Sequence, residues 1–180
     1  PPAPLRYLEA SAAYGLGDLD RAAGALAAAA TAGEVERWRI DRLGALIALG
    51  RGEVEAAARL AHRALIAGPL SAKSTSGYVF ALALDRAGAI EEARRELVRV
   101  RAGETRPRAG LDALLPVHER LYLVALEQEA RGQAAGAIAV WQVYLAQPAV
   151  QEAERVQARR RVAELGAGAG AVEGKGKGGR

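Results

Sequence analysis

The sequence predicts an all-α protein, built as a solenoid of about four helical hairpins followed by a C-terminal capping helix. Three observations lead to this prediction. Apolar residues recur at the 3.6-residue period of a helix face, as in 54–65, and no segment alternates as a half-buried strand does. Glycine recurs at intervals of 35, 36 and 44 residues, at Gly17, Gly52, Gly88 and Gly132. Alanine recurs at fixed distances on both sides of these glycines.

The alanine columns indicate where two helices of a hairpin cross. Small residues allow a close crossing, and glycine can end the first helix in the left-handed conformation without a Cβ penalty. We therefore expect a positive φ at each of the four glycines. The alanines seven residues before and five residues after each glycine are Ala10, Ala45, Ala81, Ala125, Ala22, Ala57, Ala93 and Ala137.

The first half of the chain is expected to hold two helix pairs. Residues 1–4 contain three prolines and are expected to form a linker. The first pair is expected over 5–16 and 19–30, and its second helix is nearly all alanine. The second pair is expected over 34–67, with its turn at Gly52.

The second half is expected to hold two more pairs and the cap. Ser71 is the expected N-cap of the third pair, which should be followed by a turn-rich insertion at 103–110. One helical domain is expected over 5–165, and the glycine-rich segment 166–180 is expected to be a flexible tail. The remaining expected helical segments are 72–87, 90–101, the fourth pair over 116–147, and the capping helix over 150–165.

The repeating pattern over about 5–148 resembles the tetratricopeptide repeat family. It shares that family's period and its small-residue columns, whereas the tryptophan column, eleven residues before the glycine, holds Arg6, Asp41, Gly77 and Leu121. The resemblance implies a right-handed α-solenoid whose first helices line a concave surface. It also implies a non-catalytic protein-interaction or scaffold module.

The implied concave groove would bind a peptide or protein segment. Its columns lie ten, six and three residues before each glycine; tyrosine holds three of four places in the first column and leucine three of four in the second. Tyrosine suits recognition because a large ring carries a polar tip, although such rings can instead hold repeats together. The groove residues are Tyr7, Ser11, Tyr14, Arg42, Leu46, Leu49, Tyr78, Leu82, Asp85, Tyr122, Leu126 and Glu129.

Composition argues against several other functions. The chain has no cysteine, which excludes a disulfide framework, thiol catalysis and cysteine-ligated zinc. His62 and His118 have no second ligand at metal-binding spacing, and no serine has a suggested base, so we expect no metal, no cofactor and no enzymatic activity. Glutamines and a proline interrupt the longest uncharged run, 132–151, which argues against a transmembrane segment.

The densest basic patch lies in the expected capping helix. It consists of Arg155, Arg159, Arg160 and Arg161, and acidic residues interleave with it. A solvated cap is the favoured interpretation, since no aromatic residue offers a stacking platform for bases. The alternative is a regulatory helical-repeat domain of a larger signalling or transcription protein, in which this helix contacts nucleic acid.

Overall fold

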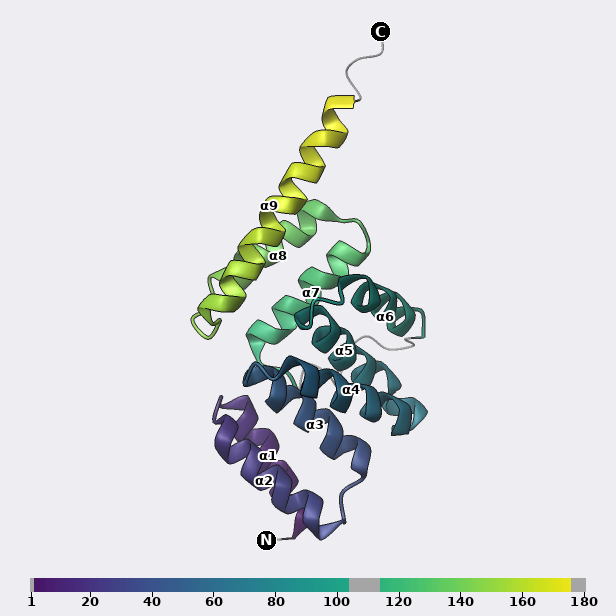
Figure 1. Cartoon of the computed structure of the whole chain (residues 1–180), viewed down its shortest axis with the longest axis vertical. Helices are drawn as coiled ribbons and strands as arrows, with labels where there is room; N and C mark the ends of the chain where they lie inside the picture. Colours follow the sequence, from purple (N-terminus) through teal and green to yellow (C-terminus); the bar gives the residue numbers. More distant parts are fainter. Residues whose placement is uncertain (1, 104–113, 176–180) are drawn as a thin grey trace. The chain divides into compact units, whose positions relative to one another are not determined.

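A computed structural model describes residues 2–103 and 114–175 of the chain, with side chains through residue 168. Every regular element in these ranges is an α-helix, which confirms the all-α prediction (Figure 1). The expected insertion at 103–110 falls, from residue 104 onward, outside the described residues. The helices are α1 (Ala3–Gly15), α2 (Leu19–Ala32), α3 (Arg37–Gly50), α4 (Val54–Ala67), α5 (Leu70–Arg86), α6 (Ile90–Ala102), α7 (Val117–Ala130), α8 (Ala134–Leu145) and α9 (Glu152–Lys175).

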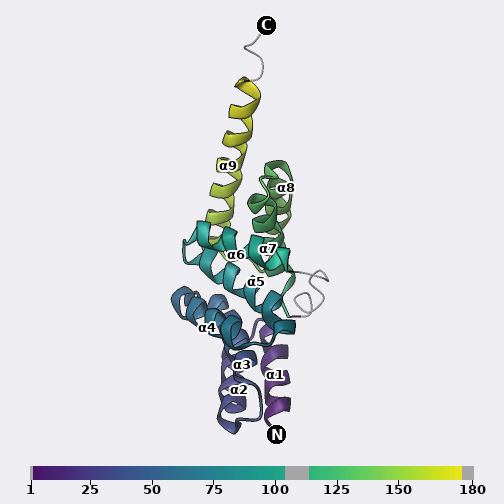
Figure 2. The ribbon, with the colours of Figure 1, turned by 90° about the vertical axis from the view of Figure 1, so that its right-hand side faces the viewer.

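The chain divides into two compact units, Pro1–Leu115 and Pro116–Arg180. In the first unit, α1 packs on α2, α3 on α4, and α5 on α6 (Figures 1 and 2). Successive pairs are joined by contacts of α2 with α3 and of α4 with α5. In the second unit, α7 packs on α8, and α8 packs on α9.

The four recurring glycines have the left-handed backbone that the sequence predicts. Their φ angles are 80°, 75°, 84° and 70° in chain order. At the second of these turns, the N–H of Gly52 donates to the carbonyl of Leu49 at 3.0 Å, and the N–H of Glu53 donates to that of Ala48 at 2.9 Å. The other three turns repeat this pair of bonds. Each first helix therefore ends in the same Schellman motif, which satisfies its terminal carbonyls.

The eight column alanines are buried, as expected at close helix crossings. Each exposes 1% or less of its surface. A larger side chain at these places would push the two helices of a pair apart, because interiors are packed at crystal-like density. The sequence thus predicts correctly which residues lie between the helices of each pair.

Several helix boundaries differ from the expected ones, and three of the differences concern the expected linker, N-cap and tail. Helix α1 begins at Ala3, inside the expected linker, because proline is tolerated in a first helical turn. Helix α5 begins at Leu70 after Pro69, which replaces Ser71 as the N-cap residue. Helix α9 continues to Lys175, past the expected tail boundary at Gly166, although the four glycines of this stretch lower its helix propensity.

The packing of α5 on α6 depends on a glycine, and we expect Gly77→Ala to destabilise the protein by about 1–3 kcal/mol. A Cβ built at Gly77 would lie 2.3 Å from Cγ2 of Val100 and 2.9 Å from Oε1 of Glu96. Gly24→Ala in α2 is the matched control, since a Cβ there meets nothing within 4 Å. The control should stabilise by up to about 1 kcal/mol, because alanine favours helix over glycine. Urea unfolding measures both, and stabilisation by both substitutions would contradict the close contact.

Candidate functional site

The predicted concave groove is not an open surface. Tyr78 exposes 1% of its surface and Tyr122 exposes 0%, so the prediction that they face a partner is wrong. Tyr7, Ser11 and Arg42 are half-buried, and the Glu129 side chain exposes only 4%. The remaining predicted groove residues are all buried: Tyr14, Leu46, Leu49, Leu82, Asp85 and Leu126.

Contacts between helices explain why these columns are buried. In the first unit, α3 contacts both α1 and α5, so its face carrying Leu46 and Leu49 is covered. In the second unit, the Tyr122 ring packs edge-on against Trp141 and Tyr144, with centroid distances of 4.8 and 5.4 Å. These columns therefore serve packing, which was the other use that the sequence left open for such rings.

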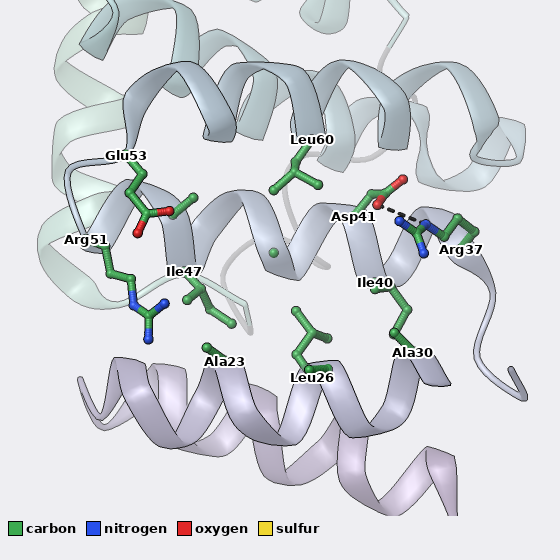
Figure 3. A pocket seen from close by; sticks show the side chains of 13 residues that line it. Ala23, Leu26, Ala30, Arg37, Ile40, Asp41, Ile47, Arg51, Glu53 and Leu60 are labelled. Carbon is green, nitrogen blue, oxygen red and sulfur yellow. Dashed lines mark ion pairs between the residues drawn. The ribbon is translucent and has the colours of Figure 1, made fainter. Parts of the chain in front are cut away.

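The first unit has an open groove on a different face. It runs over α3 between α2 and α4 and has a volume of about 280 Å³ (Figure 3). The groove is open to solvent, since residues on its rim such as Ala27 and Glu53 are exposed. None of the twelve predicted residues lines it. The lining residues are Ala23, Leu26, Ala27, Ala30, Arg37, Ile40, Asp41, Gly44, Ile47, Ala48, Arg51, Glu53 and Leu60.

A glycine forms the middle of the groove floor. Gly44 lies in the centre of α3, and its nearest neighbours from the flanking helices are Leu26 of α2 and Leu60 of α4, which face this helix from its two sides in Figure 3. A Cβ at Gly44 would come within 3.5 Å of Leu60 Cδ1 and 3.6 Å of Leu26 Cδ2. These are ordinary contact distances, so any side chain longer than alanine would fill the groove at this point. Glycine thus keeps the floor clear.

One end of the groove holds a buried carboxylate between two arginines. The Asp41 side chain exposes 3% of its surface. Its Oδ1 atom lies 3.2 Å from Nε of Arg37 in an ion pair and accepts a hydrogen bond from a terminal nitrogen of Arg63 at 2.8 Å. The two arginine side chains remain 67% and 55% exposed. Two guanidinium groups therefore share one carboxylate, and this end carries one net positive charge.

The other end of the groove carries a net negative charge. A terminal nitrogen of Arg51 donates to Asp20 Oδ1 at 2.6 Å and to the carbonyl of Leu19 at 3.3 Å. Glu53 stands exposed beside this pair at the start of α4 (Figure 3). One arginine here faces two carboxylates. The groove is therefore apolar along its floor and oppositely charged at its ends.

Two residues of α3 carried a signal for this groove. Gly44 and Asp41 both stand inside an otherwise apolar helical pattern, where glycine weakens the helix and a carboxylate is costly to bury. A helix-interior glycine points to a place where a side chain would be in the way. The sequence of α2, which forms one wall of the groove, gave no such indication, because alanine occurs on every face of this helix.

The arginines of α9 are engaged within the chain. Arg155 donates to the carbonyls of Leu145, Gln147 and Val150, which caps the end of α8. Arg161 exposes 5% of its side chain and pairs with Glu129 at 2.7 Å. The other two pair with acidic residues of their own helix: Arg159 with Glu152 at 3.0 Å and Arg160 with Glu164 at 3.6 Å. The arginines that suggested nucleic-acid binding are therefore largely paired within the chain.

The two histidines lie apart from any ligand set. The His62 ring packs on Phe80 with centroids 5.1 Å apart, and His118 Nε2 lies 3.9 Å from a carboxylate oxygen of Glu119. Across residues 2–103 and 114–175, no group of three or more metal-binding side chains comes together. Within the same ranges, no helix combines the length and apolar character needed to cross a membrane.

Comparison of the chain with known protein families, with curated proteins and with solved structures gave no significant match.

Proposed function

We propose that this chain is a non-catalytic, tetratricopeptide-like scaffold that binds a helical segment of another protein in the groove between α2 and α4. The four glycine-ended helix pairs support a repeat architecture of right-handed solenoid type. The groove over α3 is the observation that carries the binding function, and it replaces the tyrosine columns as the proposed contact surface.

The size and lining of the groove suit apolar side chains. An apolar cavity of about 150 Å³ accepts a benzene molecule, so the 280 Å³ of the groove accommodates one or two large side chains. Its length follows α3, whose 14 residues span about 21 Å. A partner helix of similar length would present side chains at i, i+3, i+4 and i+7 to this floor, as in other helix-in-groove complexes.

The chemistry of the lining favours binding over catalysis. Among the described residues that line the groove, none is serine, threonine, histidine, lysine or tyrosine. The Asp41 carboxylate is buried and paired with two arginines, so its role in the lining is to position these side chains. The lining thus offers apolar area and fixed charge, which are the elements of a recognition surface.

Ala27→Arg should weaken peptide binding to the groove. Ala27 is exposed on α2 and lines the groove, so the long charged side chain would occupy the binding space without entering the core. The probe is a displayed library of helical peptides of about 14 residues, with leucine at i, i+3, i+4 and i+7. We expect enrichment on the full chain and affinity reduced by about tenfold or more in the variant.

Ala12→Arg is the control for this experiment. It makes the same change at an exposed alanine of α1 that does not line the groove, so the selected peptides should bind it as they bind the natural chain. Equal loss in both variants, or a library that enriches no peptide, would show that the groove is not the binding surface.

A further inference from the structure

The charges at the two ends of the groove define the chemistry of its partner. Resting on the proposed function, we propose that the groove selects an acidic amphipathic helix and fixes its direction. Carboxylates at one end of the partner would lie at Arg37 and Arg63, while its apolar stripe would cover Leu26, Gly44 and Leu60. The opposite end of the partner would lie near Glu53.

The arginine pair is built to accept a further carboxylate. Arg37 uses Nε and Arg63 uses one terminal nitrogen to bind the same oxygen of Asp41. A guanidinium group has five N–H donors, so several donors on each side chain remain directed toward solvent. Asp41 is buried and fixes the position of both arginines. Such preorganisation lowers the entropic cost of binding a carboxylate, which arginine holds in a planar, two-bond geometry.

A third arginine lies on α4 beside Leu60. Arg59 lies one helical turn before Arg63, and the two line a shallow depression with Ala56, Leu60 and His62. Glu55 stands four residues before Arg59 on the same face of α4, so these two charges offset each other. The net positive charge of this end of the groove therefore comes from Arg37 and Arg63 against Asp41. Charges of this kind steer and orient a partner more than they tighten it.

The nearby acidic groups do not cancel this charge. Glu36, which directly precedes α3, pairs with Arg39 at 2.6 Å. Glu55 on α4 lies about two helical turns from Arg63, toward the end that already carries Glu53. The sign therefore changes along the groove from Arg63 to Glu53. A partner with its carboxylates at the wrong end would place them beside Glu53 and leave the two arginines without a carboxylate.

A charge-encoded peptide selection tests this proposal. In the leucine-patterned library, the remaining positions encode glutamate, lysine or alanine in equal shares, and the full chain is the target. Selected peptides should carry glutamate at one end and lysine at the other, and their affinity should fall as salt rises. Arg63→Gln and, separately, Arg37→Gln should each weaken such a peptide by about tenfold. Arg95→Gln on α6, an exposed arginine paired with Glu92, is the matched control and should leave the affinity unchanged.

The outcomes separate the partner's chemistry from the proposed function itself. Peptides that lose binding in Ala27→Arg but show no charge bias would leave the groove as a binding site and overturn its acidic selectivity. Unchanged peptide affinity in both Arg37→Gln and Arg63→Gln would also overturn the acidic selectivity while leaving the groove as a binding site. Absence of any groove-dependent peptide would remove both proposals. Displacement of a bound peptide by a single-stranded oligonucleotide would assign the arginines to nucleic acid and also overturn the proposal. The Arg37 variant and the charge bias keep the test valid if Arg63→Gln fails to fold.

Discussion

Replacing Arg161 with alanine should destabilise the second unit by about 3–5 kcal/mol. Arg161 pairs with Glu129 at 2.7 Å, and the two side chains expose only 5% and 4% of their surface. The other Glu129 oxygen accepts from the Trp141 indole nitrogen at 2.6 Å. Removal of the arginine would take a paired cation away from a buried carboxylate, and breaking one side of a buried pair is strongly destabilising.

Fluorescence can follow this unit separately. The chain has two tryptophans, of which Trp38 lies in the first unit and Trp141 in the second. In a Trp38→Phe background, the tryptophan fluorescence during urea unfolding therefore reports the surroundings of Trp141. Arg159→Ala is the matched control, because Arg159 and Glu152 form an exposed pair that contributes at most about 1 kcal/mol. Equal shifts for the two variants would contradict the burial of the Arg161 pair.

A double substitution separates the missing charge from lost packing. Arg161→Met with Glu129→Gln removes both charges, while the glutamine carbonyl can still accept from the Trp141 indole. Replacing a buried pair by neutral groups of similar volume is often close to neutral. We therefore expect the double variant to regain most of the stability that Arg161→Ala loses. A double variant as unstable as Arg161→Ala would assign the loss to packing.

Tyr122→Ala should cost about 3–5 kcal/mol of unfolding free energy, by analogy with other large aromatic residues. The ring is fully buried and packs edge-on against Trp141 and Tyr144, so truncation opens a cavity and removes two favourable aromatic contacts. Tyr7→Ala is the matched control, since Tyr7 occupies the equivalent column of α1 and is only half-buried. It should cost clearly less than Tyr122→Ala.

The same experiment bears on the first interpretation of the tyrosine columns. If Tyr122→Ala unfolds at the same urea concentration as the natural chain, the ring is not in a core and the open tyrosine surface returns as a binding site. A large loss of stability, with the peptide affinity of the first unit unchanged, would assign Tyr122 to packing alone.

The sequence predicts the helix pairs well because their signals are local. Each turn glycine needs a positive φ, and each column alanine needs a close crossing; both requirements are met within one pair. Periodicity likewise locates each helix, because burial on one face follows a 3.6-residue repeat. The largest difference in helix bounds is at the end of α9, which continues past Gly166 to Lys175.

The groove could not be predicted in the same way, because it depends on contacts between pairs. In α3, Leu46 and Ile47 are neighbours in sequence and equally apolar, yet Leu46 is packed away and Ile47 lines the groove. Which of these faces remains open depends on how far α2 and α4 stand apart above Gly44. That separation depends on side chains distant in sequence, such as Leu26 and Leu60, so Gly44 and Asp41 alone do not show which face stays open.

The alanine-rich composition of α2 has a consequence for how the groove opens. Among its buried residues, Leu26 is the only one larger than alanine, so few apolar contacts hold this wall in place. Local opening free energies follow the amount of buried apolar contact. The wall of α2 is therefore expected to have a lower opening free energy than α3, six of whose buried residues are larger than alanine. Binding at the groove would then be coupled to the local folding of one of its own walls, and a partner would tighten the first helix pair as it docks.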